Sequence, residues 1–154
     1  MIKPTLVLTW VFPAAPQRVF DVFTQREHLN AWFGQGVEID LQVGGRFTSS
    51  DGDKARFLKV AVPRQLVFTY THPQIALDTE IDVTFAATGP RRETQVRLVH
   101  KGLDPKQISA ENYRWLLDRW NWLADNLKRY LKKEGRLEFE AWRGRTRQVS
   151  GTRD

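Results

Sequence analysis

Residues 108–134, ISAENYRWLLDRWNWLADNLKRYLKKE, contain neither glycine nor proline and are predicted to form one long helix. At about 100° per residue, one sector of this helix collects the side chains of Tyr113, Leu116, Leu117, Trp120, Ala124, Leu127 and Leu131. An apolar stripe of this kind has to be buried against another layer of structure. The segments before the helix therefore decide what it packs on.

Most of the sequence before this helix has the two-residue period of β-strands. Residues 4–12 predict a first strand that stops at Pro13, and two short helices follow at 16–23 and 26–33. From Val37 on, further strand segments are separated by turns at Gly44-Gly45, Asp51-Gly52, Pro63, Pro73 and Gly89-Pro90. These segments read VEIDL, RFTSS, KARFLKVAV, QLVFTYTH, TEIDVTFAA and ETQVRLVHK.

This order of elements predicts an α+β fold, in which a curved antiparallel sheet of six or seven strands wraps around the long C-terminal helix. No internal repeat or interdomain linker interrupts the chain, so we expect one domain over residues 1–134 and a C-terminal tail over 135–154.

Strand parity places the apolar side chains on one face of the sheet. On three consecutive strands the residues that share this face are Leu66, Phe68 and Tyr70, then Ile81, Val83 and Phe85, then Val96, Leu98 and His100. The opposite face is polar and charged, as a one-sided antiparallel sheet requires. Because a twisted sheet seldom closes tightly on a single helix, we expect either a packed interior or an apolar pocket between them.

The second short helix ends in two large rings, Trp32 and Phe33, followed by Gly34. In the expected fold these rings lie where the short helices cover the open end of the sheet. They form either a lid over an internal pocket or a plug of the packed core, and the sequence favours neither interpretation.

Several motifs together resemble a known family. They are FPAAPQRVFDVFT, REHLNAWFG, IDLQVGGRF, PRQLVFTY, VTFAATGPRRETQVRLVHKGL and, on the long helix, W-x-x-L-A-D-N-L-K-R-Y-L. The succession, over roughly residues 5–133, is similar to the bacterial homologues of the activator of heat-shock protein 90 ATPase, in the START-like (SRPBCC) superfamily. This resemblance implies a helix-grip fold and a cavity open to hydrophobic small molecules. The family positions are Trp32, Phe47, Tyr70, His100 and Trp120, whereas Arg119 stands where glycine is common.

The parity of the strands and this resemblance together define a candidate binding site. We expect a hydrophobic small molecule (a lipid, a polyketide or an aromatic compound), with Tyr70 and His100 as polar anchors. The candidate lining residues are Trp32, Phe33, Phe47, Phe57, Phe68, Tyr70, Val83, Phe85, Leu98, His100, Tyr113, Leu116 and Trp120. The alternative function is a protein-interaction module such as a chaperone regulator.

The sequence does not favour an enzyme or a cofactor-binding protein. A lone histidine on an apolar face, here His100, is more often a hydrogen-bonded core residue than a catalyst. The carboxylates Glu38, Asp40, Asp78, Glu80 and Asp82 project mostly outward, so no buried acid pair is evident. Three separated histidines without cysteine give no metal site, and no phosphate-binding loop motif occurs. We therefore expect no catalytic residue, no metal and no cofactor.

Composition suggests an ordinary cytoplasmic globular protein. No apolar run approaches the roughly 18 residues of a membrane span, and the absence of cysteine excludes disulfides. The net charge of +6 invites a nucleic-acid interpretation. However, the basic residues are scattered, with the densest cluster at Arg143, Arg145 and Arg147, which does not favour nucleic-acid binding.

Two tryptophans mark the far side of the long helix. Trp115 and Trp122 share a face opposite the predicted core, and an exposed patch of this kind usually marks an interface. Within the tail segment 137–142, LEFEAW, apolar residues alternate with acidic ones. We expect this tail to cover both tryptophans, either by folding back onto its own helix or by crossing to a second copy in a homodimer. The arginines beyond Trp142 are expected to extend into solvent.

Overall fold

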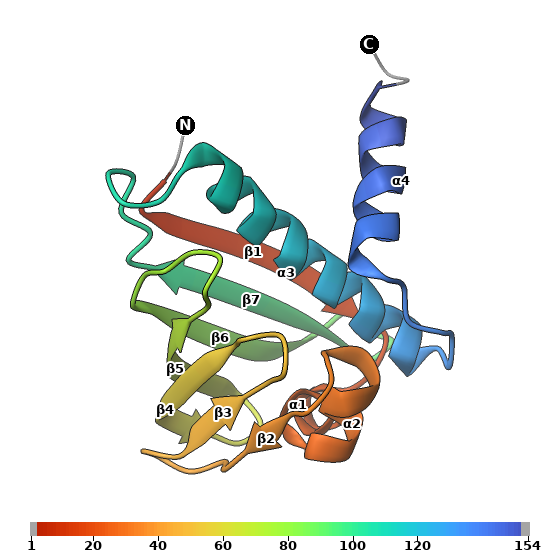
Figure 1. The fold of residues 1–154 in the computed structure, drawn as a ribbon. Coiled ribbons are helices and arrows are strands. Elements are labelled where there is room, and N and C mark those ends of the chain that lie inside the picture. Colours follow the sequence, from red (N-terminus) through yellow and green to blue (C-terminus); the bar gives the residue numbers. More distant parts are fainter. Residues whose placement is uncertain (1–2, 152–154) are drawn as a thin grey trace.

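The computed structural model describes residues 3–151 and shows a curved antiparallel sheet that holds one long helix (Figure 1). The strands are β1 (Thr5–Phe12), β2 (Glu38–Ile39), β3 (Arg46–Thr48), β4 (Lys54–Ala61), β5 (Gln65–Thr71), β6 (Thr79–Thr88) and β7 (Glu93–Lys101). The helices are α1 (Pro16–Thr24), α2 (Arg26–Trp32), α3 (Ala110–Leu131) and α4 (Phe139–Gly151). The seven-stranded sheet has the order β1-β7-β6-β5-β4-β3-β2, which confirms the predicted helix-grip class.

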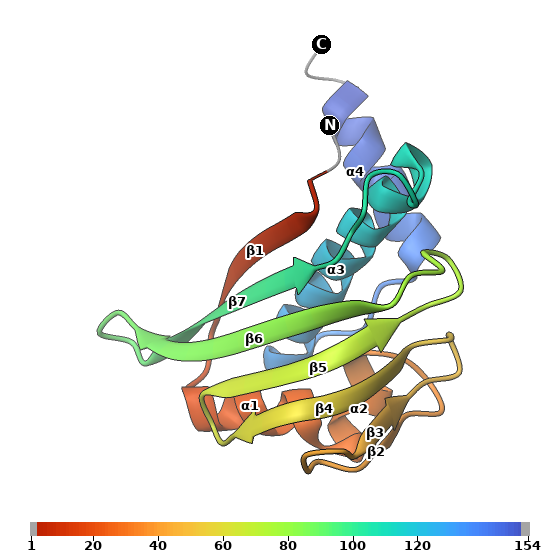
Figure 2. The same cartoon turned by 90° about the vertical axis from the view of Figure 1, so that its left-hand side faces the viewer.

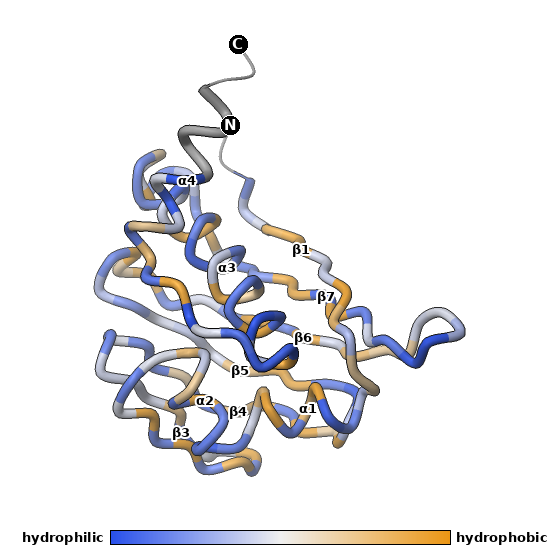
Figure 3. Tube along the Cα trace, turned by 90° about the vertical axis from the view of Figure 1, so that its right-hand side faces the viewer, coloured by the Kyte–Doolittle hydropathy of each residue, from blue (hydrophilic) through white to orange (hydrophobic). Residues whose placement is uncertain are grey.

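The strands present one face to the helices and the other to solvent. On β6 the side chains of Ile81, Val83 and Phe85 are buried, and they alternate with half-buried neighbours. Of the residues paired with them in register on β5 and β7, Leu66, Val96, Leu98 and His100 are buried and Phe68 is half-buried. Figure 2 shows the strands side by side with α3 behind them, and Figure 3 shows hydrophobic and hydrophilic colours interchanging along the strands. The predicted parity is confirmed.

Local sequence signals explain where the helices begin and end. Pro16 occupies the first turn of α1, where a missing N–H is tolerated. The side chain of Ser109 caps α3 by accepting a hydrogen bond from the Asn112 N–H, and Lys128 and Arg129 lie in the last turn, where they complement the helix dipole. The chain leaves α3 at Lys133, whose φ of 62° is a left-handed conformation.

The tail folds back on α3 of the same chain and covers both tryptophans. The Trp122 indole N–H donates to the Leu137 carbonyl at 2.8 Å, and the Phe139 ring lies 5.0 Å from Trp122 and 6.3 Å from Trp115. Trp142 donates to Asp125 at 2.7 Å. Of the two alternatives left open by the sequence, the structure therefore shows the intramolecular one.

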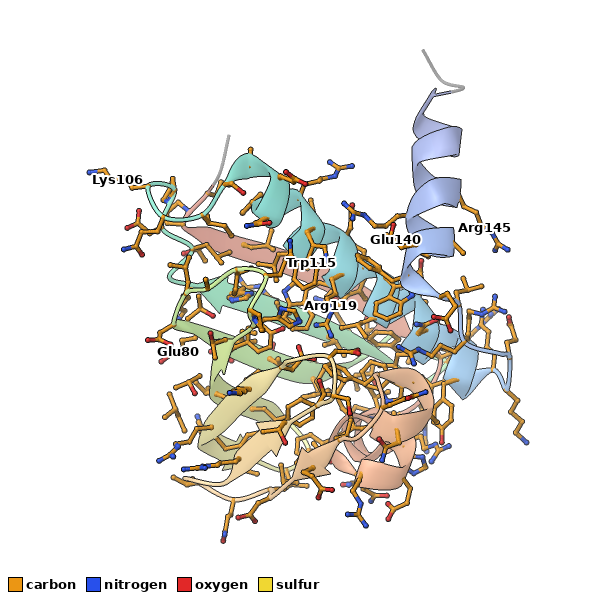
Figure 4. All side chains as sticks on the ribbon, in the orientation of Figure 1. Glu80, Lys106, Trp115, Arg119, Glu140 and Arg145 are labelled. Carbon is orange, nitrogen blue, oxygen red and sulfur yellow. The ribbon has the colours of Figure 1, made fainter. Side chains whose placement is uncertain are left out.

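The tail is helical from Phe139 onward, and in Figure 1 α4 projects away from the sheet. The expectation for the first arginine beyond Trp142 was wrong. Arg143 does not extend into solvent, because it pairs with Asp118 at 3.2 Å and lies over the Phe139 ring at 5.2 Å. Arg145 is exposed (Figure 4), whereas the side chain of Arg147 lies outside the described ones.

Candidate functional site

A cavity of about 60 Å³ lies between α3, α2 and the strands, and its wall is almost wholly apolar. Eight of the predicted residues line it: Trp32, Phe33, Phe47, Phe57, Phe68, Tyr70, Leu98 and Trp120. Further lining side chains, which are not among the candidate lining residues, include Trp10, Phe12 and Phe23, and on α3 Leu123, Ala124 and Leu127.

Five predicted residues do not line the cavity: Val83, Phe85, His100, Tyr113 and Leu116. Phe85 packs instead against rings of α1, with its centroid 5.3 Å from both Phe20 and Phe23. Leu116 is completely buried in the core. Strand parity predicted the correct face of the sheet. It did not predict which residues of that face are covered by α1 and therefore do not line the cavity.

The two rings at the end of α2 form one wall of the cavity. Trp32 is 2% exposed and donates its indole N–H to the Val22 carbonyl at 2.7 Å. Phe33 packs edge-on against Phe47 at a centroid distance of 5.3 Å. Both rings are buried in the packed core, and both also line the cavity. The two interpretations of these rings, as a plug of the core and as a lid over a pocket, therefore describe the same wall.

A buried charged cluster lies beside the cavity, on the side of Tyr70. Arg119 of α3 donates two parallel hydrogen bonds to the Asp53 carboxylate, each of 2.8 Å. Tyr70 and Ser49 donate to the same carboxylate at 2.5 Å and 2.6 Å. Asp53 is fully buried and Arg119 is 3% exposed, so this ion pair joins helix and sheet inside the protein. Figure 4 shows Arg119 between α3 and the strands.

This cluster has a defined protonation state. Burial alone would raise the pKa of the Asp53 carboxyl. The charge of Arg119 and the hydrogen bonds to Asp53 outweigh burial and hold that pKa below its usual range. Burial and the neighbouring Asp53 charge raise the pKa of Tyr70 well above its usual value, so the phenol stays neutral and donates. The hydroxyl group of Tyr70, which was expected to anchor a ligand, thus already donates its hydrogen bond to Asp53.

No motif in the sequence points to this cluster. Asp53 directly follows the Asp51-Gly52 turn, in which Gly52 has a φ of 105° that favours glycine. In the structure this turn directs Asp53 inward. Arg119 was recognised only as a departure from the family pattern, without a partner. The carboxylates expected to point outward, such as Glu38 and Asp40, do so.

His100 is a hydrogen-bonded core residue. The Trp120 indole N–H donates to its Nδ1 at 3.2 Å, which assigns the ring proton to Nε2. Nε2 then donates to the Thr79 hydroxyl at 2.7 Å, and Thr79 donates to the Tyr70 carbonyl. Burial lowers the pKa of His100 to about 3. The imidazole is therefore neutral, and both nitrogens are engaged away from the cavity.

Within residues 3–151, no group of histidine and carboxylate side chains is arranged to hold a metal ion. None of the helices in the same part of the chain combines the length and the hydropathy of a membrane span.

Comparison with solved structures relates this geometry to known proteins. The Hsp90 activator from Plasmodium falciparum matches with a TM-score of 0.74 at 19% identity, over 84% of this chain and 97% of that one. CalU16 from Micromonospora echinospora matches with a TM-score of 0.72 at 18% identity, over 90% and 80% of the two chains. The Aha1 dimer from Colwellia psychrerythraea gives 0.69 at 16% identity, over 84% and 95%. At these identities the similarity shows the fold alone.

No curated protein matches the sequence at a significant level. A sequence-family comparison does match, over residues 13–132, and this range contains the helix-grip core from α1 to the end of α3. The chain therefore belongs to the family described as Activator of Hsp90 ATPase homolog 1-like protein.

Proposed function

We propose that the protein binds a compact hydrophobic molecule between the sheet and α3, without catalysing a reaction on it. The observation that supports this proposal best is the cavity itself, which is lined by aromatic and aliphatic side chains and almost free of polar atoms. An apolar cavity of this kind stays dry and favours an apolar occupant. The family and the shared helix-grip fold are consistent with ligand binding but do not identify the ligand.

The composition of the wall narrows the ligand class. The Tyr70 hydroxyl donates its hydrogen bond to Asp53, and His100 does not line the cavity. Neither of the two expected polar anchors is therefore available to donate a hydrogen bond to a ligand. A flat aromatic molecule, including an aromatic polyketide, then fits the wall better than a lipid, whose polar head needs a partner.

The size of the cavity sets a second condition. Its volume of about 60 Å³ is well below the roughly 300 to 1,000 Å³ of typical ligand pockets. A ligand must therefore displace part of the wall. The end of α2, with Phe33 against Phe47, is the segment we expect to move, because it connects to the sheet through ring contacts and lies at the edge of the domain.

Titration with the apolar fluorophore N-phenyl-1-naphthylamine tests this proposal. We expect binding with quenching of the tryptophan emission, because Trp32 and Trp120 line the cavity. Ala124→Leu fills the cavity from α3 and should weaken binding at least tenfold. Ala86→Leu is the matched control, since Ala86 is exposed on β6. Leu116→Trp is not a suitable cavity-filling variant, because Leu116 is fully buried in the core and does not line the cavity.

The outcomes separate the candidate functions. No binding by the wild-type chain, or equal binding by both variants, would contradict the cavity proposal and favour the alternative of a protein-interaction module. The alternative partner is a second copy of the chain, bound through Trp115, Trp122 and residues 137–142. It is the less favoured partner, because the structure satisfies these groups within one chain. A cytoplasmic location also remains a prediction.

A further inference from the structure

The outer face of the sheet carries a second hollow, far larger than the internal cavity. This groove has a volume of about 790 Å³ and crosses β3, β4, β5 and the adjoining ends of β6 and β7. Its charged lining consists of Arg46, Lys54, Arg56 and Lys101 against Asp78 and Glu80. Figure 4 shows Glu80 on the side of the sheet away from α3. The groove shares Ala55 and Tyr70 with the lining of the internal cavity, but none of its charged side chains lines that cavity.

The cations at the β3–β4 end of this groove have no carboxylate partner. Among the ion pairs within residues 3–151, Lys101 pairs with Glu80 at 4.0 Å, but none involves Arg46, Lys54 or Arg56. All three side chains are exposed. This end of the groove thus has an uncompensated positive charge.

Register brings two of these cations directly opposite each other. Arg46 pairs with Arg56 across β3 and β4. The Phe57 N–H donates to the Gly45 carbonyl at 2.9 Å, and because antiparallel pairs alternate, the neighbouring Arg46–Arg56 pair is of the closely spaced type, with Cα atoms about 4.5 Å apart. Like charges in such a pair destabilise a sheet. An anion held between the two guanidinium groups removes this repulsion.

The surrounding polar groups fit a phosphate. Guanidinium groups donate paired N–H bonds that match phosphate oxygens. The Thr69 hydroxyl accepts from the Arg56 backbone N–H at 3.0 Å, which leaves its own hydrogen to donate. Thr48 and Thr71 add further hydroxyl groups on either side of Lys54, to which both are paired in register.

The carboxylates at the other end limit the size of the anion. Asp78 and Glu80 lie on the β6 side of the groove, so a long polyanion that ran along it would meet negative charge. One or two phosphate groups are accommodated at the cationic end, whereas a nucleic-acid backbone is disfavoured.

We propose that this groove binds the phosphate group of a small molecule, with Arg46 and Arg56 as its principal ligands and Lys54 and Thr69 as supporting donors.

Calorimetric titration with inorganic pyrophosphate at constant ionic strength tests the proposal. We expect Arg46→Gln and Arg56→Gln each to weaken binding at least tenfold. Arg97→Gln is the matched control, because Arg97 is an exposed residue on the outward-facing side of β7 that does not line the groove. It should change affinity less than twofold. Urea midpoints equal to that of the wild-type chain would establish that the variants are folded.

Three results would overturn the proposal: no pyrophosphate binding by the wild-type chain, equal weakening in all three variants, or tighter binding of a single-stranded oligonucleotide that also depends on Arg97. The last two would indicate a diffuse positive surface. Asp78→Asn should have the opposite effect to the arginine variants. It removes a negative charge from the groove and should therefore strengthen pyrophosphate binding.

Discussion

Arg119 determines how α3 approaches the sheet. Its guanidinium group reaches between the helix and the strands to Asp53, and it also lies 5.6 Å from the Phe33 and Trp115 ring centroids. A glycine at this position would leave Asp53 without its cation. The buried carboxylate and the arginine therefore depend on each other, and either one alone is incompatible with the interior.

Arg119→Met should consequently destabilise the fold by about 3 to 5 kcal/mol, because it leaves an unpaired carboxylate in the core. Arg114→Met is the control, since Arg114 is largely exposed and pairs with Asp118 at 3.4 Å; we expect a loss below about 1 kcal/mol. Urea unfolding followed by tryptophan fluorescence measures both. The double variant Asp53→Asn/Arg119→Met should recover part of the loss, and a double variant less stable than Arg119→Met would contradict this account.

His100 makes the stability depend on pH. Its pKa is about 3 in the folded chain and about 6.5 when unfolded, so the unfolded state binds the extra proton as the pH falls below 6.5. The folded state therefore loses about 1.4 kcal/mol per pH unit, or about 2 kcal/mol by pH 5. This contribution is present above pH 6.5 and is lost progressively toward pH 3.

Urea midpoints measured between pH 7 and pH 4 test this dependence. His100→Gln can still accept from Trp120 and donate to Thr79, and it should flatten the pH profile. His72→Gln should flatten it less, because burial and the Arg119 charge lower the pKa of His72 by a smaller amount. An unchanged profile in His100→Gln would show that the pKa of the imidazole is the same in the folded and the unfolded protein.

At the level of elements, the sequence predicted the fold well because periodicity is a local property. The two-residue alternation located the strands, and the uninterrupted segment 108–134 located α3. The tail was less predictable, because six residues with an alternating pattern are compatible with an extended segment as well as a helix. In the structure Phe139 is the first residue of α4, and its ring contacts both Trp115 and Trp122.

Truncation after Gly135 should expose these tryptophans. We expect a red-shifted emission and no change in oligomeric mass, because the tail covers its own α3. Truncation after Arg145 is the control, since it retains Phe139 and Trp142. Trp142→Phe corrects for the lost fluorophore. If the mass by light scattering halves after removal of the tail, the tail is a dimerisation arm between copies. An unchanged emission maximum would mean that the tail covers neither ring.

At the scale of the whole molecule, the sequence predicted the cavity wall only in part, because the interior is closed by long-range packing. Strand parity does not indicate that Trp10 and Phe12 of the edge strand β1 reach the same space as Phe47 of β3. It also does not indicate how far these rings fill the space. The charged cluster was missed for a related reason, since Asp53 and Arg119 are 66 positions apart in the chain.

The tail, α2 and the cavity are connected through one residue, which leads to a prediction about ligand entry. The Arg136 side chain donates from Nη2 to the Phe33 carbonyl at 3.2 Å and lies 5.0 Å from the Trp122 ring centroid. It thereby ties the end of α2, which carries a cavity wall, to α3. Its Nε is buried without a hydrogen-bond partner, so the contact is incompletely satisfied and can be released.

Arg136→Ala should therefore let the Phe33 wall move more freely and accelerate entry of N-phenyl-1-naphthylamine several-fold in stopped-flow measurements. Arg145→Ala removes an exposed arginine of the same tail and should leave the rate unchanged. The rate of entry can be compared only if the fluorophore binds at equilibrium. The equilibrium titration therefore tests the cavity, and the rate comparison tests only the path by which the ligand enters it. Equal association rates in the wild-type chain and Arg136→Ala would place the entrance elsewhere, and slower entry in Arg136→Ala would mean that the arginine holds the wall open rather than closed.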